Sequence, residues 1–341
     1  MEKILTIVIP TYNMEKYLHK CLDSLLIKDE RVLNNIQVLV VNDGSKDSSS
    51  VIGHEYEKKY PNIFRVIDKE NGNYGSCINR GLKEATGKYI KVLDADDYFD
   101  TDVFGAFVRC LADINTELVI SDYDVVDEGD RITSSFTFGS KMQPNLPLNF
   151  SQVINKNNLN IQMHGVCYKK SIFYNIDYHQ IEGVSYTDQQ WTFYPLTQIK
   201  SVYYFPNALY KYLIGREGQT MANLMEVKNI DQLMVVALEM ARVFDEEKWD
   251  RHIYSPLLEN KLKGQLKVIY ETEIINKRNA PNIKQFDEKL KKYPKSYELP
   301  SSFEYRSLHY VDYVRSHGFK NIPSILIYTY KIYNRILSTC K

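Results

Sequence analysis

Short apolar runs rich in β-branched residues alternate with segments of helical periodicity along the first half of the chain. The runs predict strands at residues 4–9, 36–41, 64–67, 89–93 and 118–121. Helices are predicted at residues 15–27, in the segment that ends at residue 60 before a proline, and at residues 76–85. Strands that alternate with helices indicate an α/β fold with a mostly parallel, doubly wound sheet.

The second half of the chain follows a different pattern. Turn residues and two prolines interrupt any regular period over residues 128–159. Further along, the period is helical at residues 233–244 and 254–275, and a charged stretch comes after them. We therefore predict an α/β domain over residues 1–225 and a helical region over residues 226–341.

Polar clusters follow three of the predicted strands at the points where these strands end. They are residues 10–13, 42–45 and 94–97. In a doubly wound sheet, ligands bind beyond the carboxyl ends of the strands. Because three clusters converge on that edge, they predict a ligand site there more strongly than any one cluster does alone.

Composition and charge narrow the class of protein. The 43 basic and 43 acidic side chains give a formal net charge of zero, so no overall field attracts nucleic acid. The five cysteines are scattered and form no close pair of the kind that binds zinc, which is typical of reduced thiols in a cytosolic protein. No signal-peptide pattern and no membrane-spanning run is present. We expect a cytoplasmic protein with no nucleic-acid partner, and its oligomeric state stays open.

The sharpest chemical feature is the pair Asp94 and Asp96, which directly follows an apolar run. Two carboxylates one residue apart can share a divalent cation where the backbone turns. Oxygen ligands suit Mg²⁺ or Mn²⁺, and these ions usually complete their coordination with substrate phosphates. The alternative is a solvated acidic turn, since this spacing is common by chance.

Other polar residues near the predicted edge have weaker individual signals. Asp43 can accept hydrogen bonds from a base or a ribose hydroxyl, or it can help to cap the next helix. Asn71 and Gly72 precede a predicted helix, where glycine permits close approach of a ligand or forms an ordinary turn. Arg80 on that helix can reach a phosphate or lie solvated at the surface.

Together, these motifs resemble family 2 of the glycosyltransferases, the inverting GT-A group. The matching residues stand in the family's order and spacing at 8–13, 41–45, 71–80, 87 and 93–97. The resemblance implies a GT-A fold, a UDP-sugar donor and Mn²⁺ or Mg²⁺ as cofactor. It further implies that residues 1–125 form the nucleotide-sugar half of the α/β domain and residues 126–225 the acceptor half.

The resemblance also implies roles for single residues. The nucleotide-sugar site would consist of Pro10, Thr11, Tyr12, Asn13, Asp43, Asn71, Gly72, Arg80, Asp94, Ala95, Asp96, Arg216 and Gln219. Asp43 would bind the uracil, Asp94 would lie near the ribose, and Asp96 would hold the metal against the diphosphate. Asn73 interrupts the Gly-Gly form that is commoner in the family.

The family also requires a catalytic base in the second half of this domain. Asp188 stands where the second acid of an acidic pair is found, while Thr187 replaces the first acid. Trp191 would then face the acceptor, and His164 would touch the metal, the donor or the acceptor, or simply pack. The alternative role of Asp188 is to cap a short helix, and both roles are compatible. Arg216 and Gln219 lie in a segment that would cover the diphosphate or form a surface loop.

The function implied is transfer of a sugar from a UDP-sugar to a glycan or lipid-linked acceptor with inversion, in synthesis of capsule, exopolysaccharide or cell-wall glycan. Asp188 would act as general base, and the cation would neutralise charge on the leaving UDP. A nicotinamide-binding oxidoreductase would need Gly-x-Gly-x-x-Gly after the first strand, where Pro10 to Asn13 stand instead. A catalytically silent sugar-binding or scaffolding relative stays open because Thr187 replaces an acid.

The last 21 residues, 321–341, combine apolar, tyrosine and basic side chains. Such a helix can lie in the headgroup plane at the inner face of the cell membrane, which would suit a lipid-linked acceptor. Its apolar residues are spread around most of the helix, which favours the alternative of packing on the protein's own core. The sequence leaves both interpretations in place.

Overall fold

The computed structural model describes residues 3–156, 159–216, 229–246, 249–276, 280–305 and 308–319. By its internal contacts the chain divides into two compact units, Met1–Ala222 and Asn223–Lys341. The segment 321–341, with its predicted membrane-facing or core-packed helix, lies outside the described residues. In the part of the chain that is described, no helix has the length and apolar character needed to cross a membrane.

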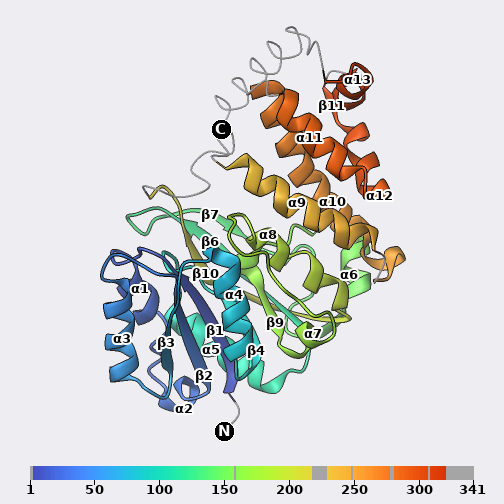
Figure 1. Cartoon of the computed structure of the whole chain (residues 1–341). Coiled ribbons are helices and arrows are strands. Elements are labelled where there is room, and N and C mark those ends of the chain that lie inside the picture. Colours follow the sequence, from blue (N-terminus) through green and yellow to red (C-terminus); the bar gives the residue numbers. More distant parts are fainter. Residues whose placement is uncertain are drawn as a thin grey trace. The chain divides into compact units, whose positions relative to one another are not determined.

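The first unit is built on one large mixed sheet (Figure 1). Its strands are β1 (Lys3–Thr11), β2 (Ile36–Asn42), β3 (Phe64–Asp68), β4 (Gly87–Val92), β5 (Tyr98–Phe99), β6 (Leu118–Val126), β7 (Ile132–Phe136), β8 (Pro147–Asn149), β9 (Val166–Lys169) and β10 (Ser201–Leu213). Its α-helices are α1 (Leu18–Asp23), α2 (Glu30–Leu33), α3 (Ser49–Lys59), α4 (Asn73–Glu84), α5 (Thr101–Asp113), α6 (Phe150–Lys156), α7 (Ser171–Tyr174) and α8 (Asp188–Trp191). Two 3₁₀ helices, η1 (Met163–Gly165) and η2 (Tyr194–Gln198), complete it.

The strand order is β3-β2-β1-β4-β9-β6-β10-β5, with β7 added beside β6 and β8 beside β10. Strands β3, β2, β1 and β4 are mutually parallel, and β6 is parallel to β10. Strand β9 is inserted antiparallel between β4 and β6, so β4 and β6 run in the same direction. The carboxyl ends of β1, β2, β4, β6 and β10 therefore lie along one edge, and the predicted mostly parallel α/β sheet is confirmed.

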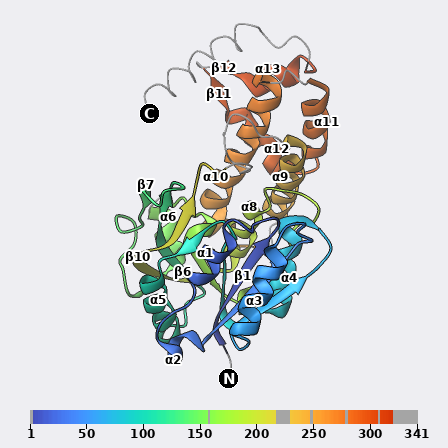
Figure 2. The ribbon, with the colours of Figure 1, turned by 90° about the vertical axis from the view of Figure 1, so that its left-hand side faces the viewer.

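The central strands are mostly apolar because helices cover both faces of the sheet. Val8 on β1 faces Gly81 of α4, where even a Cβ atom would overlap the valine. Ile7 and Ile9 point the other way and pack in the cluster that holds Phe104 and Phe107 of α5. Helices α4 and α5 thus lie on opposite faces of β1 (Figures 1 and 2).

Two predicted elements differ from the structure. The helix predicted over residues 15–27 is limited to α1, Leu18–Asp23, because the residues before it bond to the loop after β2. The backbone amides of Met14 and Glu15 donate to Ser49 Oγ (2.7 Å) and Asp47 Oδ2 (3.0 Å). Helix α5 was not predicted, although Asp100 at its N-cap accepts a hydrogen bond from the Val103 amide and its apolar residues recur with helical spacing.

The second unit is mainly helical. It contains α9 (Ile230–Asp245), α10 (Arg251–Tyr270), the π-helical turn η3 (Glu271–Asn276), α11 (Ala280–Leu290), α12 (Pro294–Glu298), the 3₁₀ helix η4 (Leu299–Ser302), the two-stranded β11 (Glu304–Tyr305) and β12 (Leu308–His309), and α13 (Tyr310–Ser316). The predicted helices over residues 233–244 and 254–275 correspond to α9 and to α10 with η3. A helical C-terminal region is therefore confirmed.

Candidate active site

The loops that follow β1 and β2 are bonded to each other. The Thr11 carbonyl accepts from the Asp43 amide at 2.8 Å, and Ser45 Oγ accepts from the Asn13 amide at 3.0 Å. Asn13 has a positive φ of 54°, which turns its side chain back so that Oδ1 accepts from the Lys46 amide. Thr11 is buried while Tyr12 is 46% exposed. These contacts bring the first two polar clusters of the sequence into one wall.

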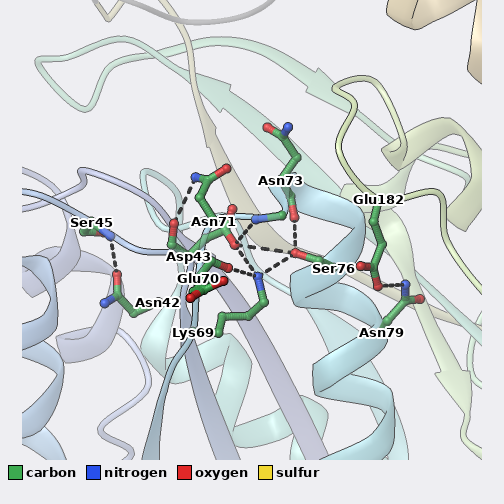
Figure 3. Close-up of polar contacts among 11 residues, drawn as sticks. Asn42, Asp43, Ser45, Lys69, Glu70, Asn71, Asn73, Ser76, Asn79 and Glu182 are labelled. Carbon is green, nitrogen blue, oxygen red and sulfur yellow. Dashed lines mark hydrogen bonds and ion pairs between the residues drawn. The ribbon is translucent and has the colours of Figure 1, made fainter.

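Asp43 is the buried acid of that wall. Its Oδ1 accepts from Lys69 Nζ at 2.5 Å and from the Gly72 amide at 2.9 Å, and Asn71 Nδ2 donates to its carbonyl at 2.9 Å (Figure 3). Lys69, which the sequence did not single out, balances the buried charge. Asp43 does not cap α3; that helix begins at Ser49, whose amide donates to Asp47 Oδ1.

Asp97 holds the acidic segment after β4 against β10. Its Oδ2 accepts from the Tyr210 hydroxyl at 2.6 Å and its Oδ1 accepts from the Leu213 amide at 2.7 Å. The same Tyr210 oxygen accepts from the Asp94 amide at 3.1 Å. Burial, and after it the charges of Asp96 and Asp94, raise the pKa of Asp97 well above its ordinary value. These hydrogen bonds therefore form the backbone turn at residues 94–97, the acidic turn, which two carboxylates would need in order to share a cation.

Asp94 lies between this turn and helix α4. Its Oδ1 accepts from the hydroxyl of Tyr74, a residue of the first turn of α4, at 2.9 Å. Burial first, and then the charge of Asp96, raise the pKa of Asp94 to about 7, while the Tyr74 hydrogen bond opposes the shift. The charge of Asp188 adds to it and also raises the pKa of Tyr74. Asp188 is therefore near enough to Asp94 for the charge of one carboxylate to act on the other.

Asp96 forms an ion pair with Arg216, which follows the end of β10. The guanidinium also stands 5.7 Å from the centre of the Tyr17 ring. From the family resemblance we predicted that Asp96 binds the metal and that Arg216 lies in a segment that covers the diphosphate. The structure brings the two side chains together across 120 residues.

Asp94, Asp97 and His164 could hold a cation, since their ligand atoms all lie within 4.8 Å of one another. The His164 ring is stacked on Tyr212 with centroids 4.2 Å apart, and its Nδ1 is buried with no hydrogen-bond partner in the part of the chain that is described. Burial lowers the pKa of His164 to about 3, and Lys91 contributes, so the imidazole is neutral and able to ligate. Two carboxylates and an imidazole suit Mn²⁺.

Lys91 is a fully buried lysine in the middle of β4, which the sequence did not single out. Its Nζ donates to the carbonyl oxygens of His164 (2.7 Å) and Val166 (3.1 Å). Burial lowers the pKa of Lys91 to about 8. These two bonds hold η1 against β4 and so position His164. A lysine inside an apolar run was the signal that could have identified it.

Asp188 is brought to the site by a segment docked on α4. The Gly183 amide donates to the Gly72 carbonyl at 2.8 Å, and Asn79 Nδ2 donates to Glu182 Oε1 at 2.8 Å (Figure 3). A Cβ atom on Gly75 would lie 1.9 Å from the Ile181 carbonyl oxygen, so only glycine permits this approach. Gly75 thus admits the neighbouring backbone of residues 180–181.

Asp188 itself is the first residue of α8, and Thr187 occupies the N-cap position. The Asp188 carboxylate accepts from Gln189 Nε2 at 2.8 Å. Thr187, where the family has an acid, is fully buried, and its hydroxyl has no hydrogen-bond partner among the described residues.

Two predicted contacts need correction. Trp191 is only 1% exposed, because its ring stacks on Phe173 with centroids 5.0 Å apart, so it packs in the core and does not face an acceptor. Arg80 forms an ion pair of 3.0 Å with Glu84, which ends α4 on the side away from the acidic turn. The phosphate role of Arg80 is therefore withdrawn. Gln219 lies outside the described residues.

Tyr74 was missed in the sequence, and its hydroxyl orients Asp94. We expect Tyr74→Phe to lower kcat about tenfold, since a hydrogen bond to a charged group contributes roughly 1.5–3 kcal/mol. Steady-state kinetics with a UDP-sugar checks this, and a melting temperature near that of wild type shows that the fold is kept. Tyr174→Phe, at a side chain 71% exposed, is the matched control. An unchanged kcat in Tyr74→Phe would contradict the role.

Comparison with known proteins agrees with this geometry. A family model described as glycosyl transferase family 2 matches residues 6–181. An uncharacterized glycosyltransferase of Mycoplasma pneumoniae is 42% identical over 122 residues, which cover 35% of this chain and 39% of that protein. The minor teichoic acid biosynthesis protein GgaB of Bacillus subtilis is 41% identical over 99 residues, covering 29% of this chain and 11% of GgaB. These matches span well under half of the relatives' own length.

Among solved structures, residues 1–349 of TarS from S. aureus, in complex with UDP-GlcNAc, have a similar fold. The TM-score is 0.69 at 17% sequence identity, and the match covers 96% of this chain and 91% of the TarS chain. At this identity the likeness concerns the fold alone, and it confirms the expected GT-A architecture.

Proposed function

This chain belongs to glycosyltransferase family 2, and from that premise we propose a UDP-sugar-dependent transfer reaction. The acceptor is a glycan or a lipid-linked glycan, the configuration at the anomeric carbon is inverted, and the product is a surface polysaccharide. In this proposal residues 1–125 bind the donor and residues 126–225 supply the acceptor side and the base. The observation that carries it is the cluster of Asp94, Asp97 and His164 at the carboxyl edge of the sheet, with Asp188 near enough for its charge to act on Asp94.

The donor would bind across the loops after β1 and β2. Asp43 Oδ1 accepts from Lys69 and Gly72, and in this proposal the same carboxylate also accepts from the uracil imide. Pro10, Thr11 and Tyr12 flank this position, and Tyr12 is exposed enough to cover a base. Arg216 would exchange its bond with Asp96 for one with the diphosphate.

The transfer would then be a single displacement. Asp188 would take the proton of the acceptor hydroxyl as that oxygen attacks the anomeric carbon. Asp94, Asp97 and His164, with Asp96 beside them, would hold a divalent cation, whose Lewis acidity offsets charge on the departing diphosphate. Tyr74 and Lys91 would keep Asp94 and His164 in place. The protein itself supplies orientation, proton transfer and charge compensation.

We place this reaction in the cytoplasm, at the inner face of the membrane when the acceptor is lipid-linked. Cys21, Cys77, Cys110 and Cys167 are free thiols, which supports a reducing compartment.

The test is a donor screen that measures UDP release from each common UDP-sugar with Mn²⁺ and with Mg²⁺. We expect release from one or a few donors, at a rate at least ten times that without cation. No release from any donor, with UDP-sugar binding intact by calorimetry, would favour the alternative of a silent sugar-binding relative.

A further inference from the structure

A row of aromatic rings leads from the acidic turn to the surface of the first unit. Phe136 on β7 stacks on Tyr123 of β6, with centroids 4.7 Å apart and planes 11° from parallel. Tyr123 lies 5.2 Å from the His164 ring, which in turn stacks on Tyr212 at 4.2 Å. Tyr210 closes the row, 5.0 Å from His164. Strand β7 pairs with β6 and lies next to it in Figure 1.

Strand register explains why these rings share one face. Tyr123 is paired with Phe136 on one side and with Tyr210 on the other, so the three side chains project together. Tyr212 is two residues further along β10 and projects to the same face. The hydroxyl of Ser135, on the opposite face of β7, bonds to Asp124 Oδ1 at 2.6 Å. The aromatic row is therefore separate from the polar pairs beneath it.

The two ends of the row differ in burial. Tyr210 is fully buried and donates to Asp97, so the inner end touches the acidic turn. Tyr123 is 3% exposed, whereas Phe136 is 44% exposed. A cross-strand aromatic pair stabilises a hairpin, but it uses only the ring face turned toward its partner. The outer part of the Phe136 ring remains a flat apolar surface on a rigid base, and Tyr123 links that base to the His164 ring.

We propose that Phe136 is the stacking platform of an acceptor subsite that takes a pyranose ring; this rests on the proposed function. A pyranose presents C–H groups on one face, which pack on an aromatic ring such as the half-exposed Phe136, and carries its hydroxyls at the rim. In the proposed function, the uracil of the donor binds at the wall that contains Asp43. In the sheet order, this wall and strand β7 lie on opposite sides of β4. Asp127, Asp130 and Arg131, in the turn between β6 and β7, are of mixed sign, so anionic lipid is not favoured.

Saturation-transfer NMR on the full chain, with the methyl pyranosides of glucose, galactose and their N-acetylamino forms, tests the proposal directly. We expect transfer to the ring C–H protons of at least one glycoside in the wild type. Phe136→Ala should weaken binding about threefold to tenfold, and Phe136→Trp should retain it. Glycerol phosphate, an acyclic polyol, should bind wild type and Phe136→Ala alike.

Two controls separate stacking from folding. Phe136→Leu keeps apolar bulk against Tyr123 and should keep the melting temperature while losing glycoside binding. Tyr174→Ala removes an exposed ring elsewhere and should change nothing. Equal glycoside binding by wild type, Phe136→Ala and Phe136→Leu, or no binding of any glycoside to the wild type, would overturn the proposal. UDP release from a UDP-sugar, measured without any acceptor, tests the proposed function separately. The Phe136 variants should leave this release unchanged, because the proposal places Phe136 away from the loops that bind the donor.

Discussion

Asp188→Asn is expected to lower turnover by about 10²–10⁴-fold, the range that a positioned general base contributes. Asn has the same shape and can still accept from Gln189 Nε2, so α8 should keep its place beside Asp94. The affinity for a UDP-sugar should change little, because the base acts on the acceptor. Rapid-mixing or steady-state kinetics measures the loss, and calorimetry on the variant measures donor binding.

The matched controls for Asp188 are the nearby acids Asp177 and Glu182. Glu182 accepts from Asn79 and lies at the surface of the docked segment, so Glu182→Gln should retain most activity. Asp177→Asn should do the same. If Asp188→Asn keeps near-wild-type turnover while either control loses it, the base has been assigned to the wrong residue.

Asp96→Ala is expected to abolish transfer while the protein stays folded. EDTA should have the same effect on the wild type, and Mn²⁺ or Mg²⁺ should reverse it. The physical reason is that Asp96 lies beside Asp94 and Asp97 and carries the charge that Arg216 now balances. The control is Asp102→Ala, at an exposed acid in the first turn of α5. Full activity in EDTA would contradict a metal role.

The pH dependence of cation binding gives a second measurement at this site. The pKa of Asp94 is raised to about 7, so below that pH a proton occupies the carboxyl group that a cation needs. The apparent Kd for Mn²⁺ should therefore rise as pH falls, by up to about tenfold for each pH unit below 7. His164→Ala should weaken Mn²⁺ binding at every pH. Calorimetry at pH 6, 7 and 8 decides, and a Kd independent of pH would exclude Asp94 as a ligand.

Much of the architecture followed from local patterns. The runs that became β1, β2 and β4 are mostly apolar because they are buried on both faces, and burial on both faces leaves a nearly continuous signal. Polar residues at their carboxyl ends had to meet at one edge, which is how Asp43 and Asp94 were predicted as neighbours of one site. Helices α9 and α10 showed the helical period directly.

The functional partners were decided only in three dimensions. Lys69 reaches Asp43 over 26 residues, Tyr74 reaches Asp94 over 20, and Arg216 reaches Asp96 over 120. Periodicity reports whether a position is buried, but it carries no information about which distant side chain lies opposite. Trp191 is an example of this limit of sequence patterns. An aromatic residue three positions after the predicted base can pack in the core or line an acceptor site, and the pattern does not distinguish the two.

The aromatic row depends on strand pairing that the sequence does not display. Tyr123, Phe136 and Tyr210 come from three strands, one of which, β7, is short and wholly exposed. The sequence by itself determined the family, the sheet and the polar clusters at its carboxyl edge, because each depends on residues close in the chain. The tertiary structure decided which groups orient those acids and where a flat ring is left open to solvent, because both depend on the register between strands.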